Sequence, residues 1–127
     1  MKTDINQMSS SSLAFVGDAV FTLFVRRRVA LKYDKKSGGL HALQSHFVSA
    51  KAQSKMADIL LPQLTQQEKD IFARCKNAHV DNKTKAATYK EYKSATGLEG
   101  VLGYLYLDGD NERLSELCDI CFNSINI

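Results

Sequence analysis

The feature that most constrains the fold of this chain is the helical spacing of its apolar residues, which continues through most of its 127 residues. Apolar side chains recur three or four positions apart, as on one face of a helix, over residues 11–32, 40–61, 65–76, 88–107 and 111–123. No segment alternates apolar and polar residues as a half-buried strand does. The sequence therefore predicts an all-α chain without an internal repeat.

Capping and turn residues mark where these helices begin and end. Thr65 and Glu68 form a capping-box pattern, Pro62 ends the segment before it, and residues 108–110 make a turn. Residues 1–10 are polar, so we expect a loose N-terminal arm that leads to a serine cap. Residues 77–87 lack periodicity and predict an exposed loop or short helix that carries charge.

Length and composition predict a single domain over residues 1–127, because 44% hydrophobic content supplies one core. The sequence has no signal peptide and no apolar run long enough to span a membrane, and its three cysteines are an odd number, so we expect a cytoplasmic, reduced protein. Cys118 and Cys121 form a C-x-x-C pattern, but both lie at core positions of the last helix and no second such pair completes a zinc site. We interpret them as core residues.

Charge divides the chain into two unequal parts. The net charge is +3, but residues 1–95 carry +8 and residues 96–127 carry −5. The basic part favours a polyanionic partner. The acidic part is typical of a solvated final helix or of a site that attracts cations.

Two apolar segments far apart in the sequence each contain one carboxylate, Asp18 in residues 13–21 and Glu99 in residues 97–107. An ionised acid removed from water is costly unless a cation, a metal or several hydrogen bonds compensate it, and neither acid has a basic residue within a helical turn. A shared divalent cation would compensate both, and hard oxygen ligands suit magnesium. The alternative is that each acid lies at the edge of its apolar stripe and is solvated.

Three glycines, Gly17, Gly100 and Gly103, lie inside these predicted helices, where each costs about 1 kcal/mol relative to alanine. A close crossing of the two helices at glycine would offset that cost. It would also bring Asp18 and Glu99 together, although tight core packing alone is an alternative explanation.

Residues 13–20, Leu-Ala-Phe-Val-Gly-Asp-Ala-Val, resemble the signature helix of the ribonuclease III catalytic domain, and residues 98–107 resemble its partner helix. Together with residues 48–53, residues 76–79 and the Thr96-x-x-Glu99 arrangement, and with no appended double-stranded-RNA-binding domain, the chain is similar to the Mini-III ribonucleases. The resemblance covers nearly everything from about Ser11 to the last helix.

The resemblance implies an all-α, ribonuclease III endonuclease-like domain that forms a homodimer and cuts double-stranded RNA with magnesium, for which manganese is a substitute. It further implies maturation of precursor 23S ribosomal RNA, ends with 5′-phosphate and 3′-hydroxyl groups, and Asp18 and Glu99 as the catalytic, metal-binding acids. A ribosomal protein is a further candidate partner.

Double-stranded RNA is recognised mainly through its phosphates and 2′-hydroxyls, so lysine and amide donors suffice to bind it. We expect RNA contacts from residues in and before the polar loop, namely Lys76, Asn77, His79, Lys83 and Lys85. Two more, Lys51 and Gln53, follow from the resemblance. For any single lysine, an ordinary solvated surface position is an equal alternative.

Several positions depart from the pattern of the larger ribonuclease III enzymes. Ser11, Ala14 and Thr96 stand where those enzymes carry further acids, as they do in Mini-III members, which leaves two carboxylates to hold metal directly. We therefore expect weak metal binding without RNA. Further departures lie at Thr22, Gly97 and Gly100. We expect them to alter metal affinity or packing rather than to abolish activity.

Two other classes of function compete with the enzyme. A non-catalytic RNA-binding or ribosome-associated module would share the basic surface, but it would have little reason to keep both acids in apolar helices. A purely structural helical dimer would leave the uneven charge and the polar loop unexplained. The joint presence of both acids favours the enzyme.

Overall fold

The computed structural model describes residues 4–34, 36–78 and 88–125, and within these residues it contains helices and no strand. The order is α1 (Ser10–Tyr33), α2 (Ser37–Val48), α3 (Ala50–Leu60), α4 (Gln66–Asn77), α5 (Tyr89–Asp108) and α6 (Asn111–Asn123). Short 3-10 helices cover Ile5–Gln7 and Leu61–Gln63. The all-α prediction is confirmed.

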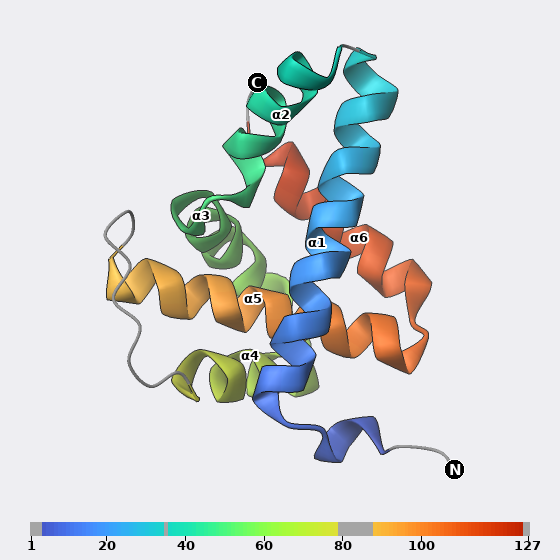
Figure 1. The fold of residues 1–127 in the computed structure, drawn as a ribbon. Helices are drawn as coiled ribbons and strands as arrows, with labels where there is room; N and C mark the ends of the chain where they lie inside the picture. The colour runs from blue at the N-terminus through green and yellow to red at the C-terminus, as the bar shows by residue number, and fades with distance from the viewer. Residues whose placement is uncertain (1–3, 35, 79–87, 126–127) are drawn as a thin grey trace.

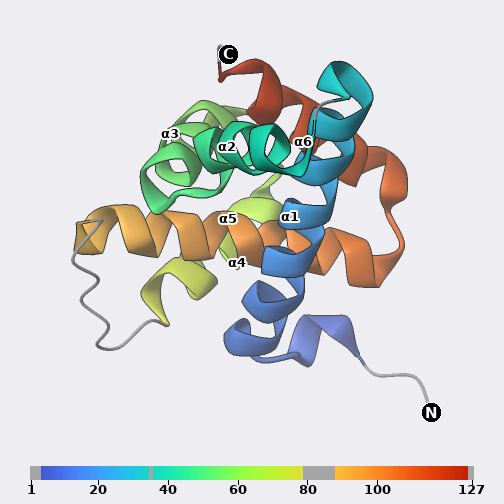
Figure 2. The ribbon, with the colours of Figure 1, turned by 45° about the horizontal axis from the view of Figure 1, so that its top comes forward.

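Helix α5 is the centre of the fold. It crosses behind α1 in Figure 1, and α3 and α4 lie on opposite sides of it in both Figure 1 and Figure 2. Buried residues follow one another almost without interruption along its second half, from Gly100 to Leu105. Helix α5 is therefore a core helix to which the others attach.

Local sequence signals account for the helix ends. Helix α4 begins with the capping box that the sequence predicts. The Thr65 hydroxyl accepts from the Glu68 backbone N–H at 3.2 Å, and the Glu68 carboxylate accepts from the Thr65 N–H at 2.9 Å. Helix α5 begins with the same device, and it ends at Gly109, whose φ of 80° is left-handed.

One long helix was predicted over residues 40–61, and this prediction is wrong, because the segment forms two helices. Ser49 ends α2 and begins α3, with an extended ψ of 152°. Its side-chain oxygen accepts from the Ala52 backbone N–H at 3.1 Å. A serine that caps the following helix in this way supplies the hydrogen bond that the interrupted backbone loses.

Not all apolar residues at helical spacing on α1 face the core. Leu13 and Val20 are buried, but Leu23 is 63% exposed and Leu31 is 73% exposed. The helix instead buries Phe21, Val25 and Val29 in its second half. The apolar residues of α1 therefore form two faces, of which one packs in the core and the other is at the surface of the single chain.

The N-terminal arm is less loose than its composition predicts. Ile5 and Met8 are partly buried against the core, and the Tyr104 hydroxyl donates to the Asn6 side-chain oxygen at 3.3 Å. The arm is therefore attached to α5 from residue 5 onward.

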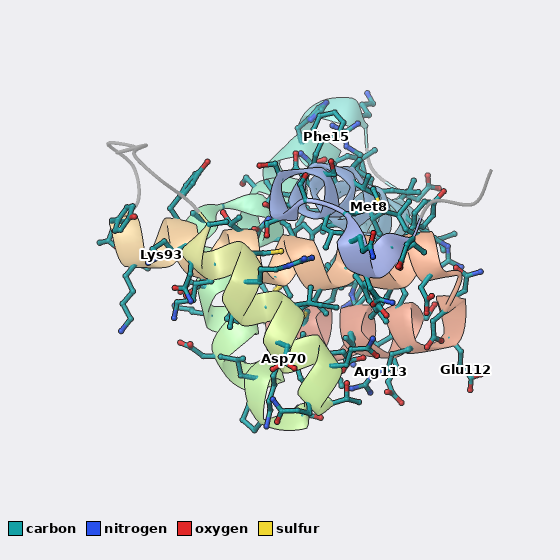
Figure 3. All side chains as sticks on the ribbon, turned by 90° about the horizontal axis from the view of Figure 1, so that it is seen from below. Met8, Phe15, Asp70, Lys93, Glu112 and Arg113 are labelled. Atoms are coloured by element: carbon teal, nitrogen blue, oxygen red, sulfur yellow. The ribbon has the colours of Figure 1, made fainter. Side chains whose placement is uncertain are left out.

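A partly buried ion pair connects α6 to the start of α4. The Arg113 guanidinium donates to both oxygens of Glu68, at 2.9 and 2.8 Å, and to the Gln63 carbonyl at 3.0 Å. Arg113 is labelled on α6 in Figure 3. Burial alone would raise the pKa of Glu68, but the hydrogen bonds from Arg113 and Thr65 hold it below its ordinary value.

The cysteines lie in the core, as the sequence predicts for the C-x-x-C pair. Cys75, Cys118 and Cys121 are buried free thiols, and burial raises the pKa of each, that of Cys121 to about 12. Among the residues described, none of the helices combines the length and apolar character needed to cross a membrane.

Candidate active site

Helices α1 and α5 touch through their backbones. A Cβ added at Gly17 would lie 1.6 Å from the Glu99 carbonyl oxygen, and one added at Gly103 would lie 2.0 Å from the Leu13 carbonyl oxygen. Both positions therefore require glycine, which confirms the predicted close crossing. Gly100, the third glycine considered, faces α4 instead, where a Cβ would lie 2.3 Å from the Cys75 sulfur.

This crossing brings the two predicted acids to one place. Asp18 follows Gly17 directly on α1, and Glu99 is the residue whose carbonyl meets Gly17. Both line a hollow of about 470 Å³ between α1, the junction of α2 and α3, and the first half of α5. Asp18 is exposed and Glu99 is partly buried, so the second acid lies deeper.

The hollow contains two acids and few groups that compensate their negative charge. Burial, and then the neighbouring Asp18, raise the pKa of Glu99 to about 8, while a hydrogen bond from the Gln53 side chain acts in the opposite direction. No lysine, arginine or histidine of the described residues lines the hollow. The pair of acids therefore favours a bound positive charge, either a proton or a cation, over two free anions.

The predicted site residues fall into four groups. Asp18 and Glu99 meet in the hollow, and Gln53 joins them from α3, but it is only 4% exposed and bonds to Glu99. Lys51 is exposed on α3 and borders a neighbouring hollow of about 410 Å³. Lys76 and Asn77 belong to the last turn of α4 and line neither hollow. The remaining three, His79, Lys83 and Lys85, lie outside the described residues.

Two polar residues of α5 besides Glu99 line the hollow and were not predicted to contribute in this way. Tyr92 precedes Glu99 by seven positions and Thr96 precedes it by three, so all three share one helix face. The Thr96 hydroxyl donates to the Tyr92 carbonyl at 3.0 Å. The helical spacing from Glu99 was the signal that could have identified Tyr92.

A divalent cation would find two direct carboxylate ligands here. In the part of the chain that the structure describes, no three histidine, cysteine, aspartate or glutamate side chains gather as a complete metal site. Magnesium keeps several waters and is commonly bound by one or two carboxylates plus substrate phosphate. Asp18 and Glu99 therefore fit a weakly held hard cation better than a fully enclosed one.

Comparisons with known proteins find relatives that align with nearly the whole chain. A Mini-ribonuclease 3 from Streptococcus pneumoniae is 36% identical over 124 residues, which cover 96% of this chain and 97% of that protein. One from Symbiobacterium thermophilum is 41% identical over 106 residues, which cover 84% of this chain and 82% of that protein. A crystal structure of a Fusobacterium nucleatum protein matches with a TM-score of 0.87 at 30% identity, over 97% of this chain and 98% of its own.

The ribonuclease III domain itself matches residues 11–110, a span that includes both acids and both glycines of the crossing. This match and the near full-length similarity to Mini-ribonuclease 3 proteins establish that the chain belongs to the ribonuclease III family.

Proposed function

We propose that this member of the ribonuclease III family is an endoribonuclease that hydrolyses phosphodiester bonds in double-stranded RNA with the help of magnesium. The observation that carries the proposal is the meeting of Asp18 and Glu99, from helices some eighty positions apart in sequence, in one open hollow. By its resemblance to the Mini-III ribonucleases, its proposed substrate is precursor 23S ribosomal RNA in the cytoplasm.

The chemistry of the two acids supports a metal at this place. The pKa of Glu99 is raised by burial and by Asp18, which means that the pair favours a bound positive charge over two free anions. Magnesium, or manganese as its substitute, would be held by these two carboxylates. A metal ion bound there supplies a more acidic water and neutralises charge on the phosphate.

The residues of the chain then act as ligands and supports rather than as proton carriers. Asp18 is exposed and presents its carboxylate to substrate and solvent, whereas Glu99 lies deeper. No histidine of the described residues lines the hollow, and its openness leaves room for water and a phosphate. We therefore expect water to be the nucleophile, and the resemblance to the Mini-III ribonucleases leads us to expect products with 5′-phosphate and 3′-hydroxyl ends.

Contacts to the RNA backbone are proposed from exposed basic residues around the hollow. Lys51 is two positions from Gln53 and one from Ala50, and both of these line the carboxylate hollow. Lys76 and Asn77 are the last two residues of α4, and they are proposed together with His79, Lys83 and Lys85 to contact phosphates. A ribosomal protein that shapes the RNA is a further proposed partner.

A second copy of the chain is the proposed partner of the exposed face of α1. Phe15 is 81% exposed, and Ala19 and Leu23 follow it at four-residue spacing, so these three form an exposed stripe.

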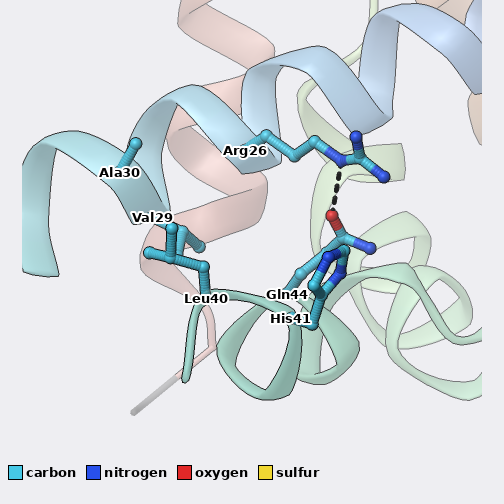
Figure 4. A pocket seen from close by; sticks show the side chains of 6 residues that line it. All are labelled: Arg26, Val29, Ala30, Leu40, His41 and Gln44. Atoms are coloured by element: carbon cyan, nitrogen blue, oxygen red, sulfur yellow. Dashed lines mark hydrogen bonds between the residues drawn. The ribbon is translucent and has the colours of Figure 1, made fainter. Parts of the chain in front are cut away.

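Further along the helix, Arg26 donates to Gln44 at 2.6 Å across a mainly apolar hollow of about 210 Å³ (Figure 4).

Such a homodimer would place the partner beside the catalytic site. Phe15 lines the carboxylate hollow as well as the exposed stripe. We therefore expect Phe15→Ala to weaken dimerisation in sedimentation velocity experiments and to lower cleavage activity in parallel.

Cleavage of a labelled RNA duplex with magnesium tests the function. The intact protein is compared with Asp18→Asn, Glu99→Gln and a matched control, Glu112→Gln, which changes an exposed acid at the start of α6. We expect cleavage to be lost in the two site variants, with folding and RNA binding retained, and to be unchanged in the control. Binding without cleavage by the intact protein would instead support the non-catalytic RNA-binding module.

A further inference from the structure

Gln53 is a buried polar side chain in the middle of a helix, and such a side chain needs a hydrogen-bond partner. It is 4% exposed, and among the described residues the other buried polar or charged side chains are Glu68 and Ser94. Glu68 is compensated by Arg113. Gln53 and Glu99 line the same hollow, and a hydrogen bond from the Gln53 side chain acts to lower the pKa of the Glu99 carboxyl.

The backbone beneath Gln53 is held firmly. Its N–H donates to the Ser49 carbonyl at 2.9 Å, and Ser49 in turn caps α3 through its side chain. On the same helix, Ala52, Met56 and Ala57 are buried in the core. A side chain that extends from this position has few alternative directions, so its amide is fixed relative to α5.

The chemistry of the amide differs from that of a basic residue. A lysine or arginine beside Glu99 would neutralise the carboxylate and compete with a cation for it. An amide N–H fixes the orientation of the carboxylate while leaving its negative charge available. Burial also makes Gln53 poorly suited to the RNA contact expected from the sequence, because a phosphate is bound at the surface.

We propose that Gln53 is a positioning residue that holds Glu99 in its metal-binding orientation and does not itself bind RNA. This role rests on the proposed function, because it assumes that Glu99 is a metal ligand. Residues that orient a metal ligand typically contribute 10-fold to 100-fold in metal affinity or activity.

The test compares the intact protein with Gln53→Leu, which removes the amide but fits an apolar environment. Three quantities are measured: duplex affinity by fluorescence anisotropy without divalent metal, manganese affinity by electron paramagnetic resonance, and single-turnover cleavage across a magnesium titration. Gln67→Leu is the matched control, because Gln67 bonds to Tyr104 on the far side of α5 from α3 and does not line the site.

We expect Gln53→Leu to bind RNA within about twofold of the intact protein, to need more metal, and to cleave roughly 10-fold to 100-fold more slowly at a fixed magnesium concentration. Loss of RNA affinity with normal cleavage at saturating RNA would overturn the proposal in favour of a direct RNA contact. Unchanged metal affinity and cleavage would also overturn it.

Two further comparisons keep the result interpretable. If Gln53→Leu does not fold, Gln53→Met provides an unbranched side chain of similar length without the donor, and the same outcomes apply. Glu99→Gln separates the two proposals: if Glu99→Gln still cleaves RNA, the proposed function fails, whereas an inactive Glu99→Gln beside a fully active Gln53→Leu refutes the positioning role alone.

Discussion

Replacing Gly17 by alanine tests the geometry on which the site depends. The added Cβ would lie 1.6 Å from the Glu99 carbonyl oxygen and 2.5 Å from its carbon, whereas ordinary contact begins at 3.4 Å. Restoring that contact requires the two helices to separate by about 1.8 Å. The obstacle is backbone, so no side-chain rotation relieves it.

The expected change in stability follows from two opposing effects. Alanine is favoured over glycine inside a helix by about 1 kcal/mol. Overpacking a close contact costs typically about 1–3 kcal/mol, and a backbone-to-backbone clash belongs at the upper end or beyond. We therefore expect Gly17→Ala to lower the free energy of unfolding by at least about 2 kcal/mol, a large part of the stability of a small domain.

Urea unfolding followed by circular dichroism at 222 nm measures this change. Gly38→Ala is the matched control, because a Cβ at Gly38 on α2 would have no neighbour within 4 Å. We expect the control to be neutral or up to about 1 kcal/mol more stable, according to helix propensity alone. If Gly17→Ala were as stable as the intact protein, the close crossing of α1 and α5 would be refuted.

Three further predictions concern charge. Without divalent metal, the folded protein keeps a proton on Glu99 up to a pKa of about 8, whereas the unfolded chain releases it above the ordinary pKa of 4.5. The free energy of unfolding should therefore fall as pH rises from about 4.5 to 8. Thermal unfolding at several pH values should show this fall, and Glu99→Gln should flatten it. Lys51→Ala should weaken duplex binding and reduce the slope of log K against log salt concentration by about 0.7–1. An equal effect of Lys69→Ala, on α4, would argue against a local contact at Lys51. Arg113→Met should destabilise the fold by about 3 kcal/mol in urea, because it leaves Glu68 buried without its cation; Glu68→Gln should cost less, and equal losses would contradict this reasoning.

The sequence predicted the parts of the molecule that depend on local spacing. Caps, turns and apolar periodicity located α4, α5 and α6 closely, and an acid with a nearby glycine in two apolar helices was enough to predict that Asp18 and Glu99 meet. These features are encoded within a few positions of the residues concerned.

Other features were not predictable from the spacing of apolar residues. Ser49 breaks a continuous apolar pattern because its side chain caps α3, and the spacing of its neighbours does not reveal this. Leu23 and Leu31 have helical spacing but lie on a second face of α1, which periodicity cannot assign to core or surface. Gln53 was expected from the resemblance to contact RNA, and its burial beside Glu99 follows from the packing of α3 on α5, which local sequence does not show.

The contact of α1 with α5 through main-chain atoms has a consequence for protein engineering. The spacing of the two acids is set by peptide geometry at Gly17 and Gly103 rather than by the shapes of apolar side chains. Substitutions that repack the core around α6, for example at Leu114 or Leu117, should change thermal tolerance without altering the site. A thermostable variant can therefore be sought in the core while these two glycines are left untouched.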